Sequence, residues 1–189
     1  MKQLRSLALL FLILAGCSSS GGVISYSAMD SGYSPTEFAY AGGPGELWTE
    51  VMGNPFTQPK PDLDRAVTDA MYEAHFGPAT RFTTMPGPAG RRSYHVRLMF
   101  NGPETNSMSA CGAVSAPQPA YRGGDVLIFA AFCRDDRALT FLRASGDRFT
   151  GPEDPRFQLF IREITIRLFP PQNPDMHNQV HDNCQMDDC

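Results

Sequence analysis

Residues 125–133 read DVLIFAAFC, and this stretch decides the expected fold. Apolar residues occupy both odd and even positions, a pattern typical of a strand that is buried on both faces of a sheet. The next four residues, RDDR at 134–137, are expected to turn the chain, and residues 138–143 to pair back as a hairpin. Asp135 and Asp136 are therefore interpreted as turn residues and not as paired catalytic acids. The segment 125–133 predicts the central strand of one sheet.

Further strands are expected on either side of this segment. Residues 94–100 alternate cleanly, with Tyr94, Val96, Leu98 and Phe100 on one face and His95, Arg97 and Met99 on the other. This alternation predicts a half-buried strand with one polar face. Residues 46–52 and 81–85 predict two shorter strands. Trp48, the single tryptophan, is interpreted as an anchor in the core in preference to a ligand-stacking surface residue.

Two segments have the apolar period of a helix. The first, 61–75, begins with Pro61 and repeats Leu63, Val67, Ala70, Met71 and Ala74 at helical spacing. The second begins at Pro155 behind a capping Asp154 and repeats Phe157, Phe160, Ile161, Ile164 and Leu168. We expect an α+β domain, a small antiparallel sheet covered on one face by both helices. The alternative is a mostly β sandwich in which residues 157–169 form a strand.

The amino-terminal residues have the features of an export signal. Lys2 and Arg5 precede the apolar run LALLFLIL at 7–14, which is shorter than the ~20 residues that span a bilayer. Leu14-Ala15-Gly16-Cys17 follows, and this sequence resembles the lipobox of bacterial lipoproteins. The resemblance covers only this segment. It implies that the leader is removed before Cys17, that this cysteine is lipidated on sulfur, and that the new amino terminus is acylated; the alternative is an ordinary leader.

The lipobox also implies a location and a domain organisation. Ser18 stands where an aspartate favours inner-membrane retention in the enterobacterial version of the family, so the outer membrane of the cell envelope is expected. Residues 1–16 are then a signal peptide and 17–45, rich in Ser, Gly, Ala and Tyr, a lipidated flexible tether. Residues 46–171 form a single α+β domain, and 172–189 form a polar carboxyl-terminal tail.

Four cysteines remain once Cys17 is lipidated. An even number in an exported chain suggests two disulfides, for which three connectivities are possible. We favour Cys111 with Cys133 and Cys184 with Cys189, because the second pair is close in sequence and the first would hold the long 101–124 loop against the central strand. Zinc is the rival interpretation, but the sequence contains no C-x-x-C.

The tail contains the only weak candidates for a metal site, His177 and His181. On a helix their spacing would present two imidazoles to one ion, but Pro174 and the Asn and Asp content argue against a helix. We expect no metal and no cofactor.

Charge and motifs restrict the function. The net charge is −4 with no concentrated basic stripe, so nucleic acid is not an expected partner. The sequence has no G-x-S-x-G, H-E-x-x-H or G-x-x-x-x-G-K-[ST] motif. We expect a non-enzymatic, lipid-anchored envelope protein that binds an envelope protein or cell-wall component through its sheet or its 101–124 loop. The alternatives are an exported hydrolase of unmarked type and a metal-binding accessory lipoprotein.

Overall fold

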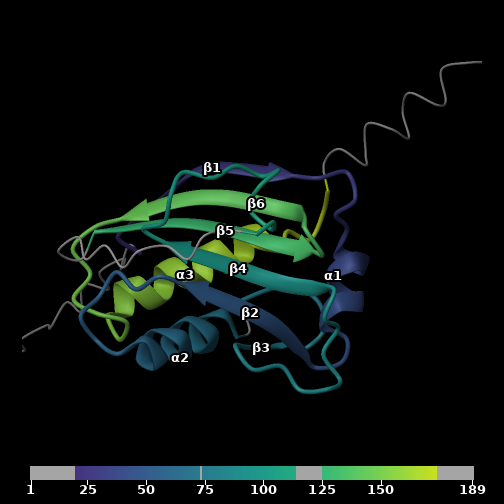
Figure 1. Cartoon of the computed structure of the whole chain (residues 1–189), viewed down its shortest axis with the longest axis horizontal. Helices are drawn as coiled ribbons and strands as arrows, with labels where there is room; N and C mark the ends of the chain where they lie inside the picture. Colours follow the sequence, from purple (N-terminus) through teal and green to yellow (C-terminus); the bar gives the residue numbers. More distant parts are fainter. Residues whose placement is uncertain (1–19, 73, 114–124, 174–189) are drawn as a thin grey trace, which may run out of the picture.

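The computed structural model describes residues 20–72, 74–113 and 125–173, which contain three helices and one six-stranded sheet. In chain order the elements are β1 (Gly22–Met29), α1 (Pro35–Gly42), β2 (Glu46–Met52), α2 (Lys60–Met71), β3 (Arg81–Thr83), β4 (Tyr94–Phe100), β5 (Val126–Arg134), β6 (Arg137–Gly146) and α3 (Pro155–Leu168). The strands lie in the order β1-β6-β5-β4-β2-β3 (Figure 1). Strand β5 is an interior strand between β4 and β6, as its apolar sequence predicts.

The prediction of an antiparallel sheet is wrong, because the sheet is mixed. Strand β2 runs parallel to β3 and also to β4, with Leu47 opposite Phe82 and Val51 opposite Leu98. Parallel neighbours need a crossover connection, and α2 supplies it between β2 and β3. The order strand, helix, strand over residues 46–83 is that of a βαβ unit, and the α+β class itself fits the structure.

Helices α2 and α3 cover one face of the sheet, behind the strands in Figure 1. Helix α3 packs on β1, β5 and β6, and α2 packs on β2 and β3. The Asp154 side chain accepts a hydrogen bond from the Arg156 backbone N–H at 2.9 Å, which confirms the predicted cap. Because 155–168 is helical, the β-sandwich alternative is wrong. The core of this face includes the fully buried Phe100, Phe132, Phe157, Phe160, Phe169, Leu63, Leu98 and Met71.

The predicted flexible tether over 17–45 is replaced by regular structure from residue 22 onward. Strand β1 pairs antiparallel with β6, and its Ile24 packs against the core. Gly22 lies so close to the ring of Phe160 that any side chain there would overlap it. Helix α1 is capped by Ser34, whose Oγ accepts a hydrogen bond from the Glu37 N–H at 3.0 Å. The folded domain therefore begins at least 24 residues earlier than predicted.

The predicted polar tail also begins later than expected. Asn173 is buried, and its Nδ2 donates to the backbone carbonyls of Tyr33 at 2.9 Å and Asp30 at 3.3 Å. Residues 172 and 173 thus belong to the domain, and 174–189 lie outside the described residues.

Among the helices in the described part of the chain, none has both the length and the apolar character needed to cross a bilayer.

Candidate functional site

The face of the sheet opposite α2 and α3, here called the open face, carries a second and smaller apolar cluster. Its buried members come from three strands and one loop: Met99, Ala110, Cys111, Phe129, Ala131, Cys133, Ala138 and Phe141. The loop is residues 101–113, which we call the cover loop because it closes part of this face in place of a helix. Each strand in this region therefore buries residues on both sides, whereas the predicted 94–100 strand had one polar face.

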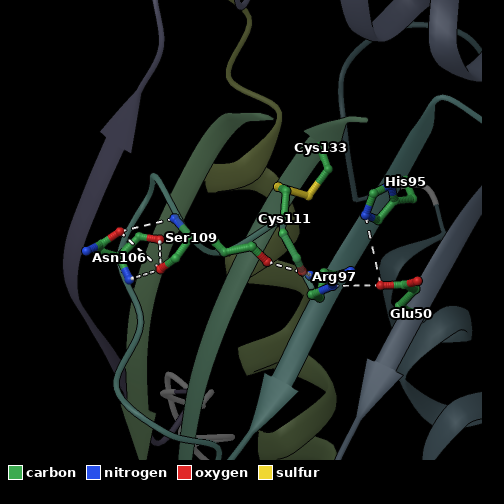
Figure 2. Close-up of a disulfide and its surroundings, with 9 residues drawn as sticks. Glu50, His95, Arg97, Asn106, Ser109, Cys111 and Cys133 are labelled. Atoms are coloured by element: carbon green, nitrogen blue, oxygen red, sulfur yellow. Dashed lines mark hydrogen bonds and ion pairs between the residues drawn. A yellow bond between two sulfur atoms is a disulfide. The ribbon is translucent and has the colours of Figure 1, made fainter. Parts of the chain in front are cut away.

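A disulfide between Cys111 and Cys133 fixes the cover loop to β5. The two Cα atoms are 5.8 Å apart and both side chains are buried (Figure 2). This pairing is the one favoured from the sequence. It closes a loop of the kind that would otherwise carry a large ordering cost.

Arg97 on β4 makes a second, polar attachment of the same loop. Its Nη1 donates to the carbonyl oxygens of Ala110 at 2.9 Å and Gly112 at 2.6 Å. Its Nε donates to Oε2 of Glu50 on β2 at 2.6 Å, which balances the charge of a guanidinium that is 12% exposed. The disulfide and this guanidinium hold adjacent residues of the loop, so residues 110–112 have little freedom.

The middle of the cover loop is shaped by its own hydrogen bonds. The Oδ1 atom of Asn106 accepts from the backbone N–H groups of Met108 at 3.0 Å and Ser109 at 3.1 Å, as in an Asx turn. This turn leaves Met108 at 87% exposure beside a cavity of 380 Å³ that also contacts Phe141 and Arg137. An exposed methionine at a fixed loop tip offers an adaptable apolar contact.

His95 on β4 lies next to this attachment and is buried without a hydrogen bond at Nε2 among the described residues. Its Nε2 is 3.9 Å from Oε2 of Glu50, too far for a hydrogen bond (Figure 2). Burial lowers the pKa of His95, as does the nearby Arg97, while Glu50 and Asp135 act in the opposite direction. The imidazole is therefore held in its neutral form with one nitrogen unused.

Trp48 on β2 packs against this imidazole. The two ring centroids are 5.1 Å apart and the planes are inclined at 41°. The indole is half-buried and lies on the open face, so the prediction of a core anchor for Trp48 is wrong. Alternation explains the error, because Leu47 and Val51 point to the helix face and leave Trp48 on the opposite one. A half-exposed tryptophan beside a buried unpaired nitrogen is a chemical feature of a recognition surface.

The other candidate residues do not join this site. His75 lies among the rings of Phe38, Phe82 and Phe169, and burial lowers its pKa. Asp135 has φ 53° at the β5–β6 turn, which confirms its turn role. Cys17, His177, His181, Cys184 and Cys189 lie outside the described residues. Within the described ranges, no three His, Cys, Asp or Glu side chains are grouped closely enough to hold a metal.

A larger cavity lies elsewhere, a groove of 1030 Å³ between α2 and β3. It contains the exposed side chains of Tyr72 and Met85, and its Arg81 pairs with Glu46 at 3.4 Å. None of the described residues with a buried, unpaired side-chain nitrogen lines this groove. We therefore place the candidate site on the open face, where the buried, unpaired Nε2 of His95 lies beside Trp48.

Comparison of the chain with protein-family models, with curated proteins and with solved structures gave no match.

Proposed function

We propose that this chain is a lipid-anchored cell-envelope protein, held by Cys17 in the outer membrane, that binds a protein partner or a cell-wall component on its open face. The observation that carries the binding role is the pairing of half-exposed Trp48 with buried His95, whose Nε2 has no hydrogen-bond partner in the described chain. Desolvated aromatic anchors are the residues that dominate interface energies.

Binding is favoured over hydrolysis by the surroundings of His95. A nucleophilic mechanism needs a hydroxyl or thiol within hydrogen-bond reach of the base. No such group of the described residues bonds to Nε2, and the neighbouring Cys133 sulfur is in a disulfide. The Glu50 carboxylate is engaged by Arg97 and is not available to receive a proton from water in the resting arrangement.

The binding role is tested by cross-linking in cells followed by purification of the tagged chain. Trp48→Ala should reduce recovery of the cross-linked partner by about 10-fold or more, as expected for loss of an interface anchor. Tyr72→Ala is the matched control, because Tyr72 is also a partly exposed aromatic but lies in the groove beside α2. Loss of the partner in Tyr72→Ala and not in Trp48→Ala would place the binding surface in the groove.

The anchor is tested separately by mass spectrometry of the amino-terminal peptide. Residues 14–17 (LAGC) predict a mature chain that begins with acylated Cys17. Cys17→Ala should block both acylation and the usual leader removal. If that variant is processed and fractionates like the parent, the lipoprotein assignment is wrong.

A further inference from the structure

The chain enters the folded domain alongside α3, between that helix and the start of β1. Ser20 is buried, and its Oγ donates a hydrogen bond of 2.8 Å to Oε2 of Glu163. The next two residues continue along the same helix, since Gly21 lies beside Arg156 and Gly22 lies against Phe160. The first residues that the structure describes are therefore held at α3 and not at the open face.

Very little chain separates this point from the proposed lipid. Only residues 18 and 19 stand between Cys17 and Ser20. Three Cα-to-Cα steps span at most roughly 11 Å. The Cα atom of Cys17 is then within that distance of the Cα atom of Ser20, so a lipid on the Cys17 sulfur holds the Ser20 end of the domain close to the bilayer and not on a long tether.

The outward surface of α3 has the composition of a membrane-facing surface. Ile166 is 48% exposed, the exposed Arg162 lies one turn before it on the same side of the helix, and the exposed Arg167 follows it in sequence. Helix α3 contains three arginines and one acid, Glu163, which already accepts the hydrogen bond from Ser20. Exposed aliphatic residues flanked by arginines suit the headgroup region of an anionic bilayer.

We infer that the outward surface of α3 rests on the anionic lipid bilayer, with Ile166 at headgroup depth and Arg162 and Arg167 on lipid phosphates. This inference depends on the proposed lipidation of Cys17 and adds an orientation to it. The open face then points away from the membrane, because α3 and the open face lie on opposite sides of the sheet (Figure 1). The anchor thereby presents Trp48 to the compartment in which a partner is met.

The orientation is tested by fluorescence quenching in the acylated mature protein, which begins at Cys17, reconstituted in phosphatidylethanolamine and phosphatidylglycerol vesicles that carry a nitroxide on some headgroups. Trp48 is the single tryptophan, so the parent protein reports on the open face. Trp48→Phe/Ile166→Trp moves the reporter to α3. Interfacial residues lie roughly 5–10 Å deep, so quenching in this variant should exceed that of the parent by about twofold or more.

The contribution of the two arginines to membrane contact is tested by introducing Arg162→Gln/Arg167→Gln into the Trp48→Phe/Ile166→Trp variant. Quenching should fall toward the parent value, whereas the matched pair Arg91→Gln/Arg92→Gln, which removes two exposed arginines from the segment before β4, should leave it unchanged. Equal effects of the two pairs would overturn the role of α3.

A second measurement needs no reporter substitution. Phenylglyoxal modification of Arg162 and Arg167 should be slower in the vesicle-bound parent than in a chain that begins at Ser18 and so has neither leader nor acyl chains, relative to Arg91 and Arg92 in the same samples. Stronger quenching of Trp48 than of the relocated reporter, or unchanged modification of α3, would overturn the orientation while leaving the anchor intact. A Cys17 peptide without acyl chains would overturn the proposed function and this orientation together.

Discussion

The two faces of the sheet are closed by different means. On the helix face, α2 and α3 bury a continuous core that contains most of the large aromatic side chains. On the open face, a loop is held over a smaller cluster by one disulfide and one guanidinium. The helix face is covered through many apolar contacts, and no single one of them holds it in place. The cover loop is held over the open face by two specific links, and one substitution can remove either link. The open face is therefore the side of the molecule that can change without loss of the fold.

The largest loss of stability is expected from a substitution in the core of the helix face. Phe132 on β5 is fully buried and contacts the rings of Tyr94, Phe38 and Phe169. Phe132→Ala should lower the free energy of unfolding by about 3–5 kcal/mol, through lost burial and the cavity left behind. Urea denaturation measures this change. The half-exposed Tyr26 is the control, and a comparable loss in Tyr26→Ala would mean that the core is not concentrated on the helix face.

The next largest loss of stability is expected when the disulfide between Cys111 and Cys133 is removed. Cys133→Ser should lower the free energy of unfolding by ~2–5 kcal/mol, mainly by releasing the unfolded chain from a cross-link. Hydrogen exchange should rise in the cover loop while α3 stays protected, because α3 packs on the other face. Non-reducing peptide mapping of the parent should recover a 111–133 pair, and Cys111→Ser should reproduce the effect. Bridges from either residue to Cys184 or Cys189 would contradict this closure.

The contrast between the faces also explains which features the sequence could predict. Helices α2 and α3 have their apolar residues at helical spacing, and α3 has its cap at the neighbouring Asp154, so local pattern predicted both helices. The predicted carboxyl end of the first helix is wrong, because α2 ends at Met71 and not at residue 75. The disulfide was predictable because Cys133 ends the most apolar strand and Cys111 lies in the loop that leads to it. In both cases the deciding residues are close in sequence.

The errors arise where distant segments decide the structure. Strand β1 has the composition of a linker and is a strand because β6 is available to pair with it. The parallel pairing of β2 with β4 joins residues that are separated by a helix and another strand. His95 was placed on a polar face, and it is buried because Trp48, the disulfide and the cover loop surround that face. No local period encodes these contacts.

A smaller loss of stability is expected when the hydrogen bonds between Arg97 and the cover loop are removed. Arg97→Gln removes the charge partner of Glu50 and leaves the carbonyls of Ala110 and Gly112 without their donor. The free energy of unfolding should fall by about 1–3 kcal/mol, the cost of unsatisfied buried groups. Cleavage by a glutamate-specific protease at Glu104, within the cover loop, should become faster. Arg92→Gln is the control, and unchanged cleavage in Arg97→Gln would show that the disulfide alone holds the loop.

The smallest effect concerns the pH dependence of stability. An unfolded imidazole titrates near pH ~6.5, and burial lowers the pKa of His95 in the folded protein despite the opposing influence of Glu50 and Asp135. Between the two pKa values the unfolded chain binds more protons, so the free energy of unfolding should decrease as pH falls below about 6.5. It should become insensitive to His95 again below the folded pKa.

Substitution of His95 separates its contribution to this pH dependence from that of the partly buried His75. Burial also lowers the pKa of His75, on the helix face, so His95→Gln should weaken the acid sensitivity without abolishing it. Urea denaturation of parent and variant at a series of pH values between about 5 and 7 measures the difference. An identical pH dependence in the two proteins would mean that His95 is as accessible to protons in the folded state as in the unfolded chain. The open face would then be more exposed than its contacts indicate, and the unpaired Nε2 would be solvated instead of available to a partner.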